Sequence, residues 1–206
     1  MTTPNANASP VSAVAAVGEA FLNAATEVYM MQTGAFWEAF NCIDALPGKL
    51  VVTGMGKAGL IGQKASATLR STGQPSAFLD PAQALHGDMG ILSYGDGLLA
   101  ISNSGETDEV LAVMNYAAEH SIKIISITSD ENSPIARKAD HSIVYPKVAE
   151  GCPIGRAPMA SCVQQMLIGD MLAAALMSRR GFTEQDFLAL HHGGYLGRTI
   201  GEKVGV

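Results

Sequence analysis

GLLAISNSGETDEVLAVMNYAAE, residues 97–119, is the stretch that decides the fold. Residues 97–101 form a continuous apolar run, which is typical of a strand buried on both faces of a sheet. Small and polar residues follow at 102–107, and apolar residues then recur at helical spacing over 108–119. A buried strand that leads through a short glycine-containing turn into a helix indicates an α/β protein.

The turn at 102–107, SNSGET, also predicts a site for an anion. Free backbone N–H groups at the start of a helix point into such a turn, and the helix dipole favours negative charge there. The serine and threonine hydroxyls add hydrogen-bond donors, and Gly105 lets the backbone approach a ligand closely. These residues exceed what a helix cap needs, so we expect a phosphate monoester here; a serine-capped helix without a ligand is the alternative.

Strand-like and helix-like segments alternate from Lys49 onward. The expected strands are 50–53, 76–79, 97–101, 123–128 and 142–145, and the expected helices are 57–73, 108–119, 158–180 and 183–190. Apolar strands separated by helices predict a parallel sheet of about five strands with helices on both faces. Ligands bind at the carboxyl ends of such strands, and the turns after Thr53, Ile101 and Thr128 share that edge.

A long amphipathic helix is expected before this alternation. Ser9 and Pro10 are typical of a helix start, and helical spacing continues to about Phe40, with a kink predicted near Gly34. The apolar stripe of this helix packs either on the domain or on another subunit. The expected division of the chain is a disordered segment at 1–8 and one domain at 9–206, with a core at about 49–180 and a C-terminal helix and tail at 181–206.

Composition narrows the class of protein. With 48% hydrophobic and 16% charged residues, the 206-residue chain has the composition of a soluble globular domain. Its net charge of −6 comes without a basic patch for nucleic acid. No apolar run is expected to cross a membrane, and no basic segment of the signal-peptide type precedes the Ala/Val-rich N-terminus. Three cysteines without metal-ligand spacing favour a reduced compartment, so we expect a cytoplasmic protein.

The turn after the first strand carries a candidate catalytic lysine. The glycine-rich segment at 54–59 matches a dinucleotide-binding motif only in part, and a plain tight turn is the alternative. Lys57 opposes the helix dipole in the first turn of the following helix, which suggests that it polarises a substrate oxygen.

The remaining candidates are His86, Glu109, Glu150 and His191. Each has an ordinary alternative. His86 would be a surface histidine, and Glu109 a carboxylate favoured at a helix start. Glu150 would be an acid in a loop, and His191 a residue of a solvated tail. His191 and His192 are adjacent but have no third ligand nearby in the sequence, so we predict no metal site.

Taken together and in their order along the chain, several short segments of this sequence resemble the SIS (sugar isomerase) domain family and, within it, the arabinose-5-phosphate isomerases. The resemblance runs from about 51 to 200 and rests on GMGK (54–57), STG (71–73), ALHGD (84–88), ISNSGE (101–106), CPIG (152–155) and the tail at 181–198. It implies a flavodoxin-like core, a homotetramer whose active sites are shared between subunits, and a reaction that needs no cofactor.

The resemblance also implies roles for individual residues. The implied catalytic residues are Lys57, Glu109, Glu150 and His191, with His86 as a further active-site histidine. The implied substrate-binding residues are Gly54, Ser102, Asn103, Ser104 and Thr107. The implied activity interconverts D-ribulose 5-phosphate and D-arabinose 5-phosphate through an enediol, for 3-deoxy-D-manno-octulosonate and lipopolysaccharide synthesis. We assign Glu150 as the enediol base and Glu109 as its closest rival.

Two alternative functions stay open: an isomerase of a hexulose or heptulose phosphate, and a non-catalytic sugar-phosphate-binding protein. The sequence departs from the family at His192, where a proline is common, and at Met159 and Ala160, where hydroxyl residues are common. The second departure predicts fewer substrate contacts at the start of the long helix. Many relatives carry paired CBS regulatory domains; because this sequence stops at Val206 without them, we expect no regulation through such domains.

Overall fold

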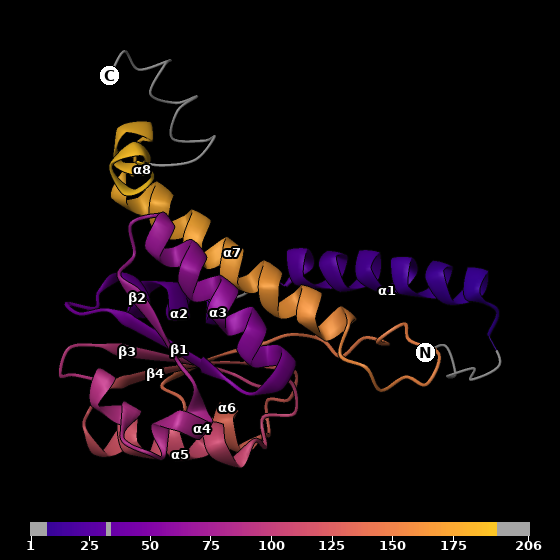
Figure 1. Cartoon of the computed structure of the whole chain (residues 1–206), viewed down its shortest axis with the longest axis horizontal. Helices are drawn as coiled ribbons and strands as arrows, with labels where there is room; N and C mark the ends of the chain where they lie inside the picture. The colour runs from indigo at the N-terminus through magenta and orange to yellow at the C-terminus, as the bar shows by residue number, and fades with distance from the viewer. Residues whose placement is uncertain (1–7, 32–33, 193–206) are drawn as a thin grey trace.

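Five parallel strands form the centre of the computed structural model, which describes residues 8–31 and 34–192 (Figure 1). The strands are β1 (Leu50–Gly54), β2 (Ser76–Leu79), β3 (Gly97–Ile101), β4 (Lys123–Thr128) and β5 (His141–Val144). Their order across the sheet is β2-β1-β3-β4-β5, and every neighbouring pair is parallel. The predicted parallel sheet of five strands is confirmed, and its order is the flavodoxin-like one.

Helices cover both faces of the sheet (Figure 1). They are α1 (Pro10–Met30), α2 (Gly34–Asp44), α3 (Gly56–Ser71), α4 (Pro81–Ala84), α5 (Asp108–Glu119), α6 (Pro134–Lys138), α7 (Ala160–Arg180) and α8 (Glu184–Leu190), with a short 3-10 helix, η1, at Asp88–Ile91. On one face α2, α3 and α7 pack together, and α1 packs on α7; on the other face lie α4, α5 and α6. Each face of the sheet has its own hydrophobic core, and strand side chains alternate between the two. Val52 and Leu99 belong to the core under α2, α3 and α7, whereas Val51 and Leu98 belong to the core under α4, α5 and α6. The continuous apolar pattern of the strands thus reflects burial on both sides.

The single N-terminal helix predicted to about Phe40 is wrong in its extent. α1 ends at Met30, and a separate helix, α2, begins at Gly34, close to the predicted kink. The physical reason is packing, because α2 places Phe36, Phe40 and Ile43 in the core beside β5 and α7, whereas α1 runs along α7. One straight helix could not bury apolar side chains in both directions.

α1 packs on the domain from about Ala16 onward, where a Cβ on Gly151 would lie 2.9 Å from the Ala16 backbone oxygen, and its first turns lie outside this contact. Ala20, Ala24 and Val28 are buried, whereas Val11 and Val14 are 81% and 75% exposed. The apolar stripe of this helix is therefore divided: one end is covered by the domain, and the other end projects from the single chain (Figure 1).

Two short helices, α4 and α6, stand where no helix is predicted from the sequence. Each begins with a capping residue followed by proline: the carboxylate of Asp80 accepts hydrogen bonds from N–H groups of α4, and the Ser133 hydroxyl accepts one from α6. The capping signals were thus present in the sequence, but helices of four and five residues are too short to show an apolar period.

The prediction that no apolar segment is able to cross a membrane is too strict. α1 and α7 are both long and apolar enough to do so by length and composition. This is weak evidence for a membrane protein, because half of the apolar window of α7 is buried inside the domain and α1 lies near the N-terminus, where signal sequences pass the same test. The predicted disorder at 1–8, apart from Ala8, and the predicted tail beyond His192 lie outside the described residues.

Candidate functional site

The strand order creates a crevice at the carboxyl ends of β1 and β3. α3 follows β1 onto one face of the sheet and α5 follows β3 onto the other, so the two turns diverge there. A pocket of about 240 Å³ lies at this point. Five of the predicted site residues line it: Lys57 from α3, and Ser102, Asn103, Ser104 and Thr107 from the turn after β3.

A larger pocket of about 620 Å³ lies at the opposite edge of the sheet, where Lys123 begins β4 and His141 begins β5. None of the predicted site residues lines it. Because ligands of open parallel sheets bind at the carboxyl ends of strands, we take the smaller pocket as the candidate site.

The turn at 102–107 is held in shape by its own hydroxyls. Ser102 Oγ accepts a hydrogen bond from the Gly105 N–H at 3.1 Å and lies 2.9 Å from Thr107 Oγ1. Ser104 Oγ accepts one from the Glu106 N–H at 3.3 Å. Thr107 is the N-cap of α5, yet its side chain makes no capping hydrogen bond. The first N–H groups of α5 are therefore available to an anion, which favours the anion site over a plain capped helix.

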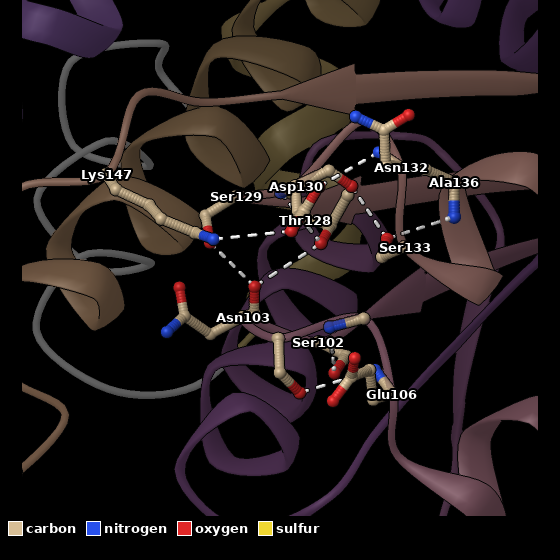
Figure 2. A network of polar contacts seen from close by, with 12 residues as sticks. Ser102, Asn103, Glu106, Thr128, Ser129, Asp130, Asn132, Ser133, Ala136 and Lys147 are labelled. Carbon is tan, nitrogen blue, oxygen red and sulfur yellow. Dashed lines mark hydrogen bonds and ion pairs between the residues drawn. The ribbon is translucent and has the colours of Figure 1, made fainter.

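Figure 2 shows how the neighbouring turn after β4 supports this one. The backbone oxygen of Asn103 accepts hydrogen bonds from Ser129 Oγ at 2.7 Å and from Thr128 Oγ1 at 3.3 Å. The carboxylate of Asp130 accepts a bond from the Asn132 N–H and pairs with Lys147 at 3.4 Å, and these contacts lower the pKa of Asp130. The turn after β4 thus positions the anion site from behind and does not line the pocket.

A chain of side-chain hydrogen bonds holds the Asn103 amide. Tyr145 Oη donates to Asn103 Oδ1 at 2.8 Å, and Gln165 Nε2 donates to Tyr145 Oη at 2.8 Å. Tyr145 is 1% exposed, and this burial raises the pKa of its hydroxyl, so the group stays protonated and able to donate. This chain ties the turn after β3 to the segment after β5 and to α7.

α7 forms a wall of the pocket that is not predicted from the sequence. Ser161, Cys162 and Gln165, all in the first two turns of α7, face the pocket together with residues of the anion turn. The helix predicted at 158–180 is confirmed as α7, which ends at Arg180 before Gly181, but its pattern of Ala, Leu and Met does not indicate that the polar residues at its start face a pocket. The expected loss of hydroxyls at Met159 and Ala160 is thus partly offset by Ser161 beside them.

Glu150 does not line the pocket but lies beside it, at the N-terminus of α7. Its Oε2 accepts hydrogen bonds from the Met159 N–H at 2.6 Å and the Ser161 N–H at 3.2 Å, so the carboxylate caps the helix. Burial raises the pKa of the Cys162 thiol; the charge of Glu150 raises it further, and that of Lys57 lowers it. Lys57, Ser161 and Cys162 line the same pocket, and Glu150 binds the Ser161 N–H, so Lys57 and Glu150 lie around one region.

Gly54 does not line the pocket. It is buried at the end of β1, and a Cβ there would lie 3.0 Å from the Ile101 backbone oxygen and 3.1 Å from the Ala58 backbone. The glycine lets α3 and β3 approach β1 closely, and the pocket depends on that approach. Its contact with substrate stays a prediction.

The structure does not bring the other predicted residues to the pocket of the same chain. Glu109 is half-buried in the first turn of α5, and His86 is exposed after α4; neither lines the pocket. His191 follows α8, where its ring stacks on Phe187 at 3.8 Å and its Nδ1 lies 2.8 Å from the Phe187 carbonyl oxygen. α7 separates His191 from Ser161, and 21 helical residues span about 30 Å.

No group of three or more His, Cys, Asp or Glu side chains able to hold a metal ion occurs within residues 8–31 and 34–192. His192 is described and exposed, and the residues after it in the predicted tail lie outside the described part of the chain. The groups that line the pocket are hydroxyls, backbone amides, the amides of Asn103 and Gln165, the Cys162 thiol and Lys57, with the Glu150 carboxylate nearby.

The SIS domain family matches residues 47–175. The chain is 43% identical over 169 residues to the arabinose 5-phosphate isomerase KdsD of Pseudomonas aeruginosa, covering 82% of this chain and 52% of that protein. It is 42% identical over 170 residues to the arabinose 5-phosphate isomerase KpsF of Escherichia coli, covering 82% of this chain and 54% of that protein. The chain thus spans about half the length of the curated relatives it matches.

A solved structure matches over nearly its whole length. The structure of c3406 of Escherichia coli CFT073, in complex with the sugar phosphate arabinose 5-phosphate, superposes with a TM-score of 0.83 at 34% sequence identity. The match covers 87% of this chain and 95% of that one.

Proposed function

The chain belongs to the SIS domain family, and from this premise we propose that it is an aldose–ketose isomerase interconverting D-ribulose 5-phosphate and D-arabinose 5-phosphate. The observation that carries the proposal is the pocket at the β1–β3 crevice, where Lys57 meets the hydroxyl-rich turn at 102–107. Relatives at 42–43% identity named arabinose 5-phosphate isomerase support it, as does the sugar-phosphate complex of a similar structure.

The proposed reaction moves one proton between two carbons. A base removes a proton from C1 of the ketose, giving an enediol, and returns a proton to C2 to form the aldose, while a proton moves between the two oxygens. In our proposal Glu150 is this base and Lys57 stabilises the developing negative charge on oxygen. Glu109 is the rival base. The turn at 102–107 holds the phosphate through hydroxyls and the N–H groups that begin α5.

The two histidines enter the proposal through neighbouring subunits. We propose a homotetramer in which His86 and His191 of adjoining copies complete each pocket and assist ring opening. The position of His191 at the far end of α7 from its own pocket supports this arrangement, and so do the uncovered first turns of α1. A single domain over residues 9–206, a cytoplasmic location and a role in lipopolysaccharide precursor synthesis belong to the same proposal.

Ribulose 5-phosphate in D2O tests the activity. We expect proton NMR to show deuterium entering the carbon next to the carbonyl and arabinose 5-phosphate accumulating. Exchange without that product would indicate an isomerase for a different sugar phosphate. Binding of ribulose 5-phosphate without exchange would indicate a sugar-phosphate-binding protein and would overturn the proposed reaction.

Ser104→Ala should weaken substrate binding. The hydroxyl faces the pocket, and a hydrogen bond to a charged group contributes about 1.5–3 kcal/mol. We expect a higher KM for ribulose 5-phosphate and less thermal protection by inorganic phosphate, with kcat little changed. Ser71→Ala is the matched control, because Ser71 Oγ bonds within α3 at its far end. Equal phosphate protection in the two variants would place the phosphate elsewhere.

A further inference from the structure

Two buried polar atoms in the wall of the candidate pocket have no hydrogen-bond partner among the described residues. They are Ser161 Oγ and Gln165 Oε1, on side chains that are 4% and 1% exposed. Both residues line the pocket. Buried polar atoms are nearly always paired, because an unpaired one loses its hydration without compensation. Atoms of this kind on the wall of a pocket indicate contact with a ligand.

The two side chains form one surface on α7. Ser161 and Gln165 are four residues apart, so they are neighbours on one face of the helix. The N–H of Ser161 is bound by the Glu150 carboxylate at 3.2 Å, which holds the first turn of α7 against the pocket. The surface lies across from the turn at 102–107, whose hydroxyls and N–H groups suit an anion.

The hydrogen-bond chain behind Gln165 defines what this surface can accept. Gln165 Nε2 donates to Tyr145 Oη, and Tyr145 Oη donates to Asn103 Oδ1. With its NH2 group directed to Tyr145, the Gln165 amide presents Oε1 as an acceptor. A fully ionised phosphate carries acceptors alone and does not satisfy it, whereas a hydroxyl group donates to it.

We propose that Ser161 and Gln165 are specificity-determining residues that bind hydroxyl groups of the sugar chain, opposite the turn that binds its phosphate. This inference rests on the proposed function for the identity of the ligand as a phosphorylated polyhydroxy chain. The pocket then has two chemically distinct ends: hydroxyl and backbone N–H donors for the phosphate, and a buried amide oxygen with a hydroxyl for the carbon chain. Gln165 also donates to Tyr145, which holds the Asn103 amide, whereas Ser102 and Ser104 shape the phosphate turn through their own hydroxyl contacts.

Gln165→Met tests the inference, because it keeps the approximate length of the side chain and removes the acceptor Oε1. It also removes the Nε2 donor to Tyr145, whereas Ser161→Ala leaves that bond in place. The probes are inorganic phosphate and arabinitol 5-phosphate, which has the hydroxyls but no carbonyl to react. By calorimetry we expect Gln165→Met to lower the affinity for arabinitol 5-phosphate about five- to tenfold, the size of one or two ordinary hydrogen bonds, and to leave the affinity for phosphate within about twofold. Ser161→Ala should likewise lower the affinity for arabinitol 5-phosphate more than the affinity for phosphate.

Gln164→Met is the matched control. Gln164 is the preceding residue of α7, equally buried at 1%, but its Nε2 donates to the Pro146 carbonyl oxygen and it does not line the pocket. We expect this variant to lose stability and to keep the wild-type preference for arabinitol 5-phosphate over phosphate.

The outcomes separate the inference from the proposed function. Equal loss of both probes in Gln165→Met would make Gln165 a structural residue, and unchanged affinity for both would mean that water satisfies Oε1; either result overturns the inference. The wild-type protein could fail to convert ribulose 5-phosphate while Gln165→Met still lowers the affinity for arabinitol 5-phosphate alone. The proposed reaction would then be wrong, and the inference about Gln165 would stand. An active enzyme whose KM is unchanged by Gln165→Met would defeat the inference alone.

Discussion

Glu150→Gln should lower the turnover of ribulose 5-phosphate by about two to four orders of magnitude, the usual contribution of a positioned general base. The amide cannot take up the proton that the enediol mechanism requires. KM should change little, because in the proposed arrangement the phosphate is held by the turn at 102–107 and the hydroxyls by α7. Steady-state kinetics of ribulose 5-phosphate conversion measure both quantities.

The substitution leaves the fold in place for a structural reason. Glu150 Oε2 caps α7 by accepting hydrogen bonds from the Met159 and Ser161 N–H groups, and the amide oxygen of glutamine can accept the same bonds. Glu150→Ala removes the cap as well, which should cost about 0.5–2 kcal/mol of stability. Comparing the two variants by urea unfolding separates the capping role from the catalytic one.

Glu109→Gln is the decisive comparison. Neither Glu109 nor Glu150 lines the pocket, but Glu150 binds the N–H of the lining residue Ser161, whereas Glu109 lies in the first turn of α5. We therefore expect a smaller loss of turnover than for Glu150→Gln. A wild-type rate in Glu150→Gln together with a collapse in Glu109→Gln would transfer the role of base to Glu109.

Gly105→Ala should disrupt the anion turn and destabilise the protein by about 2–5 kcal/mol, the sum of a left-handed backbone penalty and overpacking. Gly105 has φ of +70°, and a Cβ there would lie 2.2 Å from Ser133 Oγ and 2.4 Å from Ser133 Cβ. Ser133 is fixed in turn, because it caps α6. The turn at 102–107 must therefore move, and affinity for inorganic phosphate should fall with stability.

Gly181→Ala isolates the backbone part of this effect. Gly181 has φ of +61° at the end of α7, and a Cβ there meets nothing within 4 Å. We expect about 1–2 kcal/mol of destabilisation and unchanged phosphate binding. Urea unfolding and phosphate calorimetry on both variants check the prediction; indistinguishable results would show that the contact with Ser133 is relieved at no cost.

Most of the architecture follows from local patterns. The continuous apolar strands and the intervening helices predict the parallel sheet, because a strand buried on both faces has no polar face to show. A kink near Gly34 is predicted, but the division into the two helices α1 and α2 is not, because helical spacing continues to Phe40 and the packing of Phe36 and Phe40 into the core turns the chain. Helical periodicity indicates that one face of a helix is buried, but it does not indicate which part of the protein covers that face.

The sequence by itself determined the sheet, the hydroxyl-rich turn at 102–107 and the lysine at the neighbouring strand end, since each is a contiguous signal within one strand–turn–helix unit. Only the tertiary structure decided that Ser161 and Gln165 face that turn, that Glu150 caps α7 beside it, and that His191 lies at the far end of the same helix. These relations join residues that are far apart in the sequence, and they depend on how α7 crosses the sheet. The distances between such residues are set by how the helices pack on the sheet, and no single segment of the sequence determines that packing.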